Sequence, residues 1–312
     1  MGADSENYVL TFDVGGSHVA AAVCHGEAFQ LGPVVSALYP AEQSCEAFLQ
    51  LIHSLGVEAS TGISGVMGAE FAMPGPFDFD KGVSWMRHKL PYLYGVNLRQ
   101  QLAERCGWKA EKVRFLKDAS AFLLGEISAG TARNVARTVG ITLGTGIGSA
   151  FAVDGRLATE GRGVPPGGEI WNLPYEGRIV EDSLSTRAIQ QNYERRTGKI
   201  DEVARIAASA AVDPIAAEVF TDFGQHLGRA MRIILADFAP QMVVLGGGIS
   251  RSAHLFLPAD QSQLEDLNFC LVVSALKDRA PLVGAAAAWF SSAPELELSA
   301  SVNVRAPGVA EA

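Results

Sequence analysis

Cysteine is scarce in this sequence of 312 residues. The four that occur, Cys24, Cys45, Cys106 and Cys270, lie far apart and form no CxxC or other close pair. Such spacing supplies neither the framework of a disulfide-stapled secreted domain nor a zinc knuckle. We therefore expect reduced thiols and a cytoplasmic protein.

A net positive charge and long apolar runs are lacking as well. The formal net charge is −9, which argues against a nucleic acid as the main partner because its phosphates would be repelled. No apolar run approaches the length that crosses a membrane, and the start, MGADSENYVL, lacks the basic and apolar regions of a signal peptide. We expect neither a nucleic-acid partner nor a membrane partner.

Apolar residues, in contrast, make up 48% of the chain, which is enough to bury two domain cores. The stretch 139–153, VGITLGTGIGSAFAV, joins two apolar runs through a glycine-rich turn and predicts a β-hairpin. Its glycines are spaced GxGxG and lead back into a strand. A dinucleotide-binding turn has the spacing GxGxxG and leads into a helix, so we discount that fold.

A second copy of this pattern lies near the N-terminus. Residues 8–24, YVLTFDVGGSHVAAAVC, read as a strand, the turn Gly15-Gly16-Ser17 and a returning strand, with Asp13 just before the glycines. Glycine turns let backbone N–H groups approach an anion because no Cβ intervenes. One such turn alone would be an ordinary hairpin. A duplicated unit predicts two similar domains facing a cleft, which suits a nucleoside triphosphate.

The rest of the chain alternates between helical and strand patterns and predicts an α/β fold. Apolar residues at helical spacing predict helices at 46–55, 96–106, 119–132, 182–196, 201–209, 214–238 and 281–290. Short apolar runs predict strands at 63–71, 113–116, 242–245 and 271–275. Residues 291–312 have little helical pattern and are expected to form a loose tail.

Short motifs of glycine, proline and acidic residues punctuate the chain. In order, they are Asp13-Val-Gly-Gly-Ser17, Pro74-Gly-Pro76, Asp118 ahead of a helix, Leu143-Gly-Thr-Gly-Ile-Gly148, Gly168-Glu169-Ile170, Val244-Leu-Gly-Gly-Gly248 and Leu282-Val-Gly-Ala-Ala286. This ordered set, over residues 8–290, resembles the ROK-family sugar kinases of the actin/hexokinase/Hsp70 superfamily.

The resemblance implies two actin-like (ribonuclease H-like) α/β domains with mixed sheets flanking a central cleft. The N-terminal ATPase-type domain would cover 1–117 and the C-terminal ATPase-type domain 118–276. The last helix, 277–290, is expected to pack back on the first domain.

The resemblance also implies an enzyme that uses ATP and Mg²⁺. The turns Gly15-Gly16-Ser17 and Gly144-Thr145-Gly146 would cradle the phosphates through backbone N–H groups. Asp13 would lie near the Mg²⁺-bound phosphates, and Gly246-Gly247-Gly248 would lie against the adenosine. Without the resemblance, Asp13 would be an ordinary strand-end residue.

On the acceptor side, Asp118 would act as general base on a hexose or hexose derivative, at the 6-hydroxyl as in glucokinases. From local sequence alone, Asp118 would instead be a helix N-cap. Glu169 and Glu181 would accept hydrogen bonds from sugar hydroxyls, although by themselves they read as solvated or helix-start charges. The sugar site would also include Gly75, Lys117 and Asn172.

Two positions depart from the family pattern. Many members carry a cysteine-rich zinc motif with a His ligand where this chain has Asn172, so no zinc site is expected. Lys117 stands where glucose-using members have Asn. Its positive charge would favour an acidic or modified sugar if it enters the pocket; otherwise it turns to solvent or pairs with Glu169 or Glu181.

Two other functions compete with an ATP-dependent sugar kinase. One is a non-catalytic sugar sensor with the same fold, and the other is a chaperone-like or actin-like nucleotide module. The proline loop at 74–76 and the segment around Glu169 point away from the second. Polyphosphate could replace ATP as the donor, and family members are often homodimers.

Overall fold

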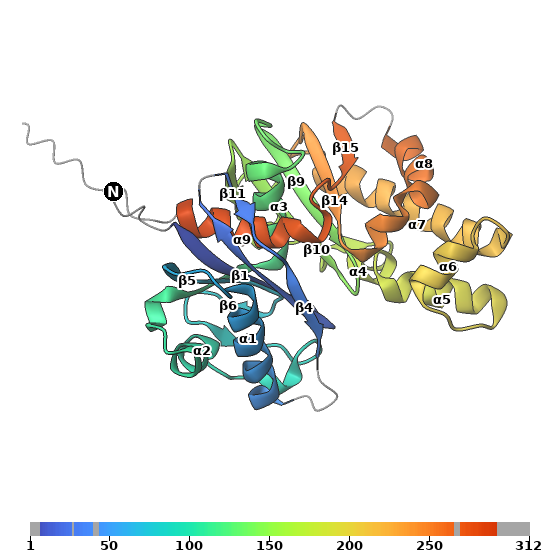
Figure 1. Ribbon diagram of the computed structural model, residues 1–312. Coiled ribbons are helices and arrows are strands. Elements are labelled where there is room, and N and C mark those ends of the chain that lie inside the picture. Colours follow the sequence, from blue (N-terminus) through green and yellow to red (C-terminus); the bar gives the residue numbers. More distant parts are fainter. Residues whose placement is uncertain (1–6, 27, 40–43, 265–268, 292–312) are drawn as a thin grey trace, which may run out of the picture.

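The computed structural model of the protein describes residues 7–26, 28–39, 44–264 and 269–291 (Figure 1). The predicted tail at 291–312 lies outside these residues, apart from Ser291, which ends the last helix. None of the helices in the described ranges combines the length and the apolar character needed to span a bilayer.

The first sheet is built around the predicted N-terminal hairpin, in which the first two strands pair antiparallel. Two later strands extend it in parallel, each after a crossover. In spatial order its strands are β3 (Gln30–Leu31), β2 (His18–His25), β1 (Tyr8–Val14), β5 (Val66–Met73) and β8 (Val113–Lys117), with β4 (Val35–Leu38) also on β2.

The second sheet repeats this plan around the second predicted hairpin, again with parallel strands added to one side. In spatial order its strands are β11 (Arg156–Ala158), β10 (Ile147–Val153), β9 (Arg137–Leu143), β14 (Met242–Gly246) and β15 (Cys270–Val273). Two short ribbons complete the β structure: β6 (Phe77–Asp78) with β7 (Val83–Ser84), and β12 (Pro174–Tyr175) with β13 (Arg178–Ile179).

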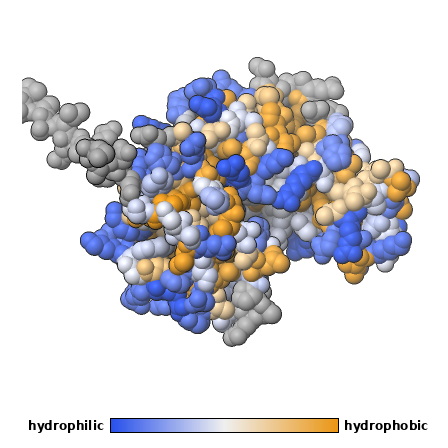
Figure 2. All heavy atoms as spheres, in the orientation of Figure 1, coloured by the Kyte–Doolittle hydropathy of each residue, from blue (hydrophilic) through white to orange (hydrophobic). Residues whose placement is uncertain are grey.

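Each sheet has its own hydrophobic core. One core is made by residues between 10 and 115 and the other by residues between 139 and 264. The α-helices are α1 (Cys45–Ala59), α2 (Leu98–Cys106), α3 (Asp118–Ala129), α4 (Val180–Ser183), α5 (Thr186–Thr197), α6 (Val203–Ser209), α7 (Pro214–Leu235), α8 (Ala253–Leu264) and α9 (Ala280–Ser291). In Figure 2 the surface is notched between the half that carries α1 and the half that carries α5.

Most predicted helices and strands are present, and two of the differences concern helices. The single helix predicted at 182–196 is divided into α4 and α5, because the Ser185 side chain accepts a hydrogen bond from the Ala188 N–H and starts a new helix. α8 was not predicted; it contains Pro258, a residue that usually argues against a helix interior.

The two halves meet through a close contact between α3 and α9 (Figure 1). α3 lies on β9 and β10, whereas α9 lies on β1 and β5 of the other sheet. A Cβ at Gly125 would lie 2.0 Å from the carbonyl oxygen of Ala280, and one at Gly284 would lie 1.7 Å from that of Ala121. Only glycine fits at both places, so the backbones can touch. The last helix thus contacts the first sheet; the domain boundaries themselves stay a prediction.

We predict that Gly284→Ala destabilises the protein by roughly 1–3 kcal/mol, since the added methyl group overpacks this contact. Alanine has a higher helix propensity than glycine, so helix propensity alone would predict a more stable variant rather than a less stable one. Urea unfolding measures the difference. Gly32→Ala is the control, because its Cβ would meet only the Val23 carbonyl oxygen at 3.4 Å. Equal stability of Gly284→Ala and wild type would contradict the close contact.

Candidate active site

Asp118 is the first residue of α3 and follows directly on β8. The N-cap position belongs to Lys117, so the alternative of Asp118 as the N-cap is not what the structure shows. The Asp118 Oδ1 atom accepts a hydrogen bond from the Ala119 N–H at 2.7 Å. Burial raises the pKa of Asp118, while the cations of Lys89 and Lys117 oppose this shift. The carboxylate is therefore a stronger base than a solvated aspartate.

Asp13 lies near the end of β1 in the first sheet, close enough to Asp118 for the two charges to interact. Burial, followed by the negative charges of Asp118 and Asp278, raises the pKa of Asp13 from 3.8 to about 7. Asp278 belongs to the short helix η5 (Lys277–Arg279) just before α9, and it forms an ion pair with Arg251. Three carboxylates from distant parts of the chain thus share one electrostatic environment.

Sequence reasoning missed two of these charged neighbours. Neither Lys89 nor Asp278 belongs to any of the motifs found in the sequence. Lys89 lowers the pKa of Asp118 and Asp278 raises that of Asp13, in each case because folding brings together residues that are distant in sequence. No local signal distinguishes them from other surface charges.

In the two glycine turns, some backbone N–H groups have no hydrogen-bond acceptor among the described residues. The N–H groups of Gly15 and Gly144 are used inside their own turns, donating to His18 O at 2.9 Å and Gly146 O at 3.0 Å. Among the described residues, no acceptor is found for the N–H groups of Gly16, Ser17, Thr145 and Gly146. A Cβ on Gly16 or Gly144 would meet nothing within 4 Å. An anion can therefore approach both turns.

The three glycines of the third cluster, Gly246, Gly247 and Gly248, have different surroundings. A Cβ at Gly246 would lie 2.3 Å from the Phe122 ring, and one at Gly247 would lie 2.3 Å from the Leu143 carbonyl oxygen. Gly247 also has a φ of +81°, in the region that favours glycine. Gly248 alone has open space beside it. This cluster is therefore packed directly against the strand that leads into the Gly144 turn.

A hydrogen bond and an ion pair connect Lys117, at the end of β8, to the loop that carries Glu169. Lys117 Nζ donates to the Gly167 carbonyl oxygen at 3.0 Å and lies 3.8 Å from Glu169 Oε1. The other oxygen of Glu169 accepts from Trp171 Nε1 at 2.8 Å. Burial lowers the pKa of Lys117, and the charges of Glu169 and Asp118 counteract this. Lys117 thus pairs with Glu169, one of the alternatives considered from sequence.

Glu181 lies between this loop and the second glycine turn. Its Oε2 atom accepts the Ile147 N–H at 3.1 Å, and its own N–H donates to the Trp171 carbonyl oxygen at 3.0 Å. Any Cβ at Gly146 would lie 2.2 Å from the same carboxylate oxygen. The remaining predicted sugar contacts are Gly75, which has open space beside its Cα, and Asn172, which is exposed.

The comparisons with known proteins agree with this geometry. The family model "ROK family" matches residues 9–292, so the chain belongs to the ROK family. It is 29% identical to a glucokinase of Thermotoga maritima over 243 residues, which is 68% of this chain and 76% of that protein.

Two crystal structures resemble the fold. The ROK hexokinase of Thermus thermophilus has a TM-score of 0.73 and 26% identity, covering 91% of this chain and 98% of that one. A ROK glucokinase of Streptomyces griseus, in complex with glucose and AMPPNP, has a TM-score of 0.76 and 22% identity, covering 89% and 98%. The predicted fold class, with two actin-like α/β halves and mixed sheets, is confirmed.

The raised pKa of Asp13 makes stability depend on pH. The unfolded chain loses this proton near pH 3.8, whereas the folded protein holds it until about pH 7. The contribution of Asp13 to the free energy of unfolding is therefore full below pH 3.8 and is lost as the pH rises through about 7. We predict that Asp13→Asn, which cannot ionise, gains stability relative to wild type as the pH rises over this interval.

Urea unfolding midpoints at about pH 4.5 and about pH 8 test this prediction. The exposed Asp154, at the far end of the β9–β10 hairpin, supplies the control variant Asp154→Asn, whose curve should run parallel to wild type. A constant difference between Asp13→Asn and wild type at both pH values would show that Asp13 titrates normally.

Proposed function

We propose that this ROK-family chain, an ATP-dependent sugar kinase, transfers a phosphoryl group to the 6-hydroxyl of a hexose or hexose derivative with Asp118 as general base. The observation that carries this proposal is the half-buried Asp118 carboxylate, which begins α3 and lies close enough to Asp13 and Glu169 for their charges to interact. The relatives support it: the Thermotoga maritima protein is a glucokinase, and the Streptomyces griseus glucokinase was crystallised with glucose and AMPPNP.

The reaction exchanges one P–O bond for another. The sugar hydroxyl oxygen bonds to the terminal phosphorus, the bond to the ADP oxygen breaks, and the hydroxyl proton passes to Asp118. Burial raises the pKa of Asp118 and so makes it a stronger base for this proton, while the cations of Lys89 and Lys117 favour its ionised form. Phosphoryl transfer otherwise depends on positioning and on neutralising the phosphate charge.

The phosphates would be bound by the uncommitted N–H groups of the two turns, with Gly248 open toward the adenosine. Asp13 fits a magnesium role, because a carboxylate beside phosphates supplies the hard oxygen ligands that this cation prefers. When bound, Mg²⁺ supplies charge neutralisation at the transferred group. The high pKa of Asp13 would fall once a cation arrives, since opposite charge favours the ionised form.

The sugar would lie against Glu169, whose orientation is fixed by Lys117 and Trp171. A carboxylate that is held in place can accept two sugar hydroxyls at little entropic cost. Gly75, Asn172 and Glu181 would complete the pocket. Since the charge of Lys117 is balanced by Glu169, this arrangement favours a neutral sugar over an acidic one.

Asp118→Asn tests the base. We predict that the variant keeps its size and hydrogen bonds but loses roughly 10²–10⁴-fold in kcat. ADP release is measured with Mg-ATP, and sugar-phosphate formation is measured separately with polyphosphate as donor, across neutral, N-acetylated, amino and acidic sugars. Asp154→Asn is the control and should match wild type.

The outcomes of this assay separate the candidate functions. Turnover that survives in Asp118→Asn would mean that the base is assigned wrongly. If wild type shows no turnover with any sugar but is thermally stabilised by one, the chain is a sensor rather than an enzyme. ATP turnover that is independent of sugar would indicate a chaperone-like or actin-like module.

Lys117→Met tests the positioning of Glu169. The variant removes the cation and the hydrogen bond to Gly167 but keeps an unbranched side chain that is only one atom shorter. We predict a sugar KM about 10-fold higher, because a hydrogen bond to a charged group contributes about 1.5–3 kcal/mol. The exposed Lys109 provides the control, Lys109→Met. An unchanged KM for neutral sugars, with a loss confined to acidic ones, would instead place Lys117 in direct contact with an acidic substrate.

A further inference from the structure

The β12–β13 hairpin directly follows the loop that carries the proposed sugar contacts. Its strands are joined by the tight turn Glu176-Gly177, in which both residues have a positive φ, +48° and +79°. At its open end, the Val180 N–H donates to the Leu173 carbonyl oxygen and the Glu181 N–H donates to that of Trp171, both at 3.0 Å. A displacement of the hairpin would therefore also displace Trp171 and Glu181.

Four side chains, which we call the hairpin clamp, connect this hairpin to α7: Tyr175, Glu176, His226 and Arg229. The hydroxyl of Tyr175, a residue that is 5% exposed, lies 3.0 Å from His226 Nδ1 and donates to the His226 carbonyl oxygen at 3.3 Å. The Glu176 carboxylate lies 3.2 Å from Arg229 Nε through Oε1 and 3.5 Å from His226 Nδ1 through Oε2. His226 and Arg229 are three residues apart and so share one face of α7, a helix of 22 residues.

The contact between Arg229 and His226 requires a neutral imidazole ring. Arg229 Nη2 lies 3.1 Å from His226 Nδ1, and a guanidinium can only donate hydrogen bonds. Nδ1 must therefore be the acceptor, which places the ring proton on Nε2. A second proton, on Nδ1, would oppose two donors to each other and break this contact. The Tyr175 hydroxyl can exchange its roles of donor and acceptor, but Arg229 cannot.

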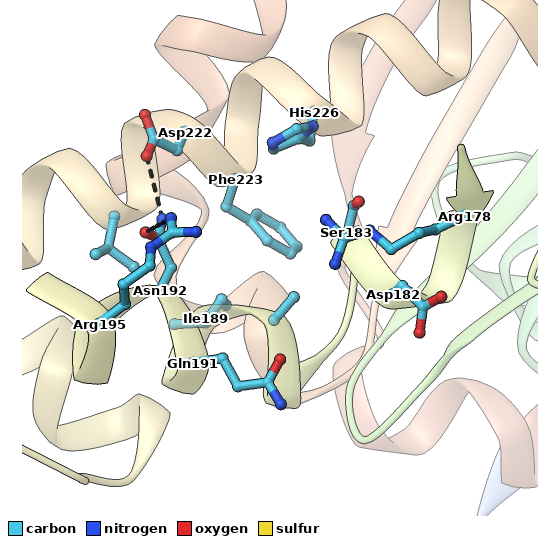
Figure 3. A pocket seen from close by; sticks show the side chains of 12 residues that line it. Arg178, Asp182, Ser183, Ile189, Gln191, Asn192, Arg195, Asp222, Phe223 and His226 are labelled. Carbon is cyan, nitrogen blue, oxygen red and sulfur yellow. Dashed lines mark hydrogen bonds between the residues drawn. The ribbon is translucent and has the colours of Figure 1, made fainter. Parts of the chain in front are cut away.

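The surroundings of the ring also favour the neutral form. Charged groups from the hairpin, α7, α4 and α5 either interact with His226 or line the same cavity (Figure 3): Glu176, Arg178, Asp222, Arg229, Asp182 and Arg195. Burial, followed by the charge of Arg229, lowers the pKa of His226 from 6.5, while the Glu176 carboxylate opposes this shift. The interactions of the neutral ring are thus complete above pH 6.5 and are lost as the pH falls below it. The His226 side chain is 31% exposed, so protons from solvent can reach it.

We propose that the hairpin clamp positions the sugar-binding segment around Trp171 and Glu181, and that protonation of His226 releases the clamp, so that sugar affinity falls in acid. Arg229 would lose its acceptor on the ring, and the new N–H of His226 would compete with Arg229 for Glu176 at the tip of the hairpin. His226 is thus a positioning residue that acts through the hairpin. The sugar as ligand rests on the proposed function, whereas the clamp rests on the contacts given above.

Two substitutions of His226 separate the acceptor from the titration. His226→Asn retains an acceptor near the position of Nδ1 but cannot be protonated. His226→Phe retains an aromatic ring but offers no acceptor to Arg229. The exposed His254 of α8 supplies the control variant, His254→Asn.

Equilibrium titrations with glucose, and separately with N-acetylglucosamine, are followed by tryptophan fluorescence at about pH 8 and about pH 5. For wild type and His254→Asn, we expect the sugar Kd to rise about 5-fold more on acidification than it does for His226→Asn, which corresponds to the loss of about one hydrogen bond. His226→Phe should bind about 5-fold more weakly than wild type already at about pH 8. All other groups titrate alike in these proteins, so the difference between wild type and His226→Asn isolates His226.

Amide hydrogen exchange provides a readout that does not depend on sugar. With all proteins compared at the same pH, the N–H groups of Val180 and Glu181 should exchange faster in His226→Phe than in His226→Asn, because a released hairpin opens locally more often.

Two binding results would overturn the proposal: an equal pH dependence of the sugar Kd in wild type and His226→Asn, or binding by His226→Phe as tight as that of wild type at about pH 8. A failure of the proposed function is distinct, because neither sugar would then bind to wild type at either pH. Hydrogen exchange still tests the clamp in that case, and equal exchange rates in all variants would overturn it.

Discussion

The contact between α3 and α9 is the constraint on which the rest of the structure depends. Each helix covers a different sheet, and the two backbones touch because Gly125 and Gly284 have no side chains. α3 begins with Asp118, and α9 follows directly on η5, the short helix that contains Asp278, so this contact also positions the segments that carry two of the three carboxylates. Packing and chemistry are therefore determined by the same pair of helices.

A buried carboxylate reinforces this arrangement. Glu126 of α3 is fully buried, and it accepts hydrogen bonds from Thr131, from the Ser274 hydroxyl and from the Leu276 N–H. The segment that it holds leads directly into Asp278. A buried polar group costs free energy unless it is hydrogen-bonded, and both side-chain oxygens of Glu126 accept hydrogen bonds. Asp13, by comparison, has its pKa raised to about 7, so the cleft keeps a destabilised carboxylate where a cation is expected.

Local sequence patterns were sufficient to predict the elements that depend on contacts between residues close in sequence. Both hairpins follow from alternating apolar residues around a glycine turn, and the α7 helix, which begins at Pro214, follows from helical periodicity. What could not be predicted depends on distant contacts. Lys89 reaches Asp118 only in the folded chain, and Gly246, which was predicted as an adenosine contact, packs on Phe122 because of how α3 crosses β14. Local sequence does not distinguish a glycine that faces a ligand from one that admits a neighbour.

Glu181 links the proposed sugar site to the proposed phosphate site. Sequence reasoning placed it with the sugar contacts, and the structure places its carboxylate on the N–H of Ile147, at the end of the second glycine turn. Its backbone N–H is held by Trp171, whose indole in turn orients Glu169. A sugar bound to Glu169, as proposed, would therefore act on the second glycine turn through Trp171 and Glu181. Such a connection would let the enzyme assemble its phosphate site when a sugar, rather than water, is present, which is how induced fit suppresses hydrolysis of the donor.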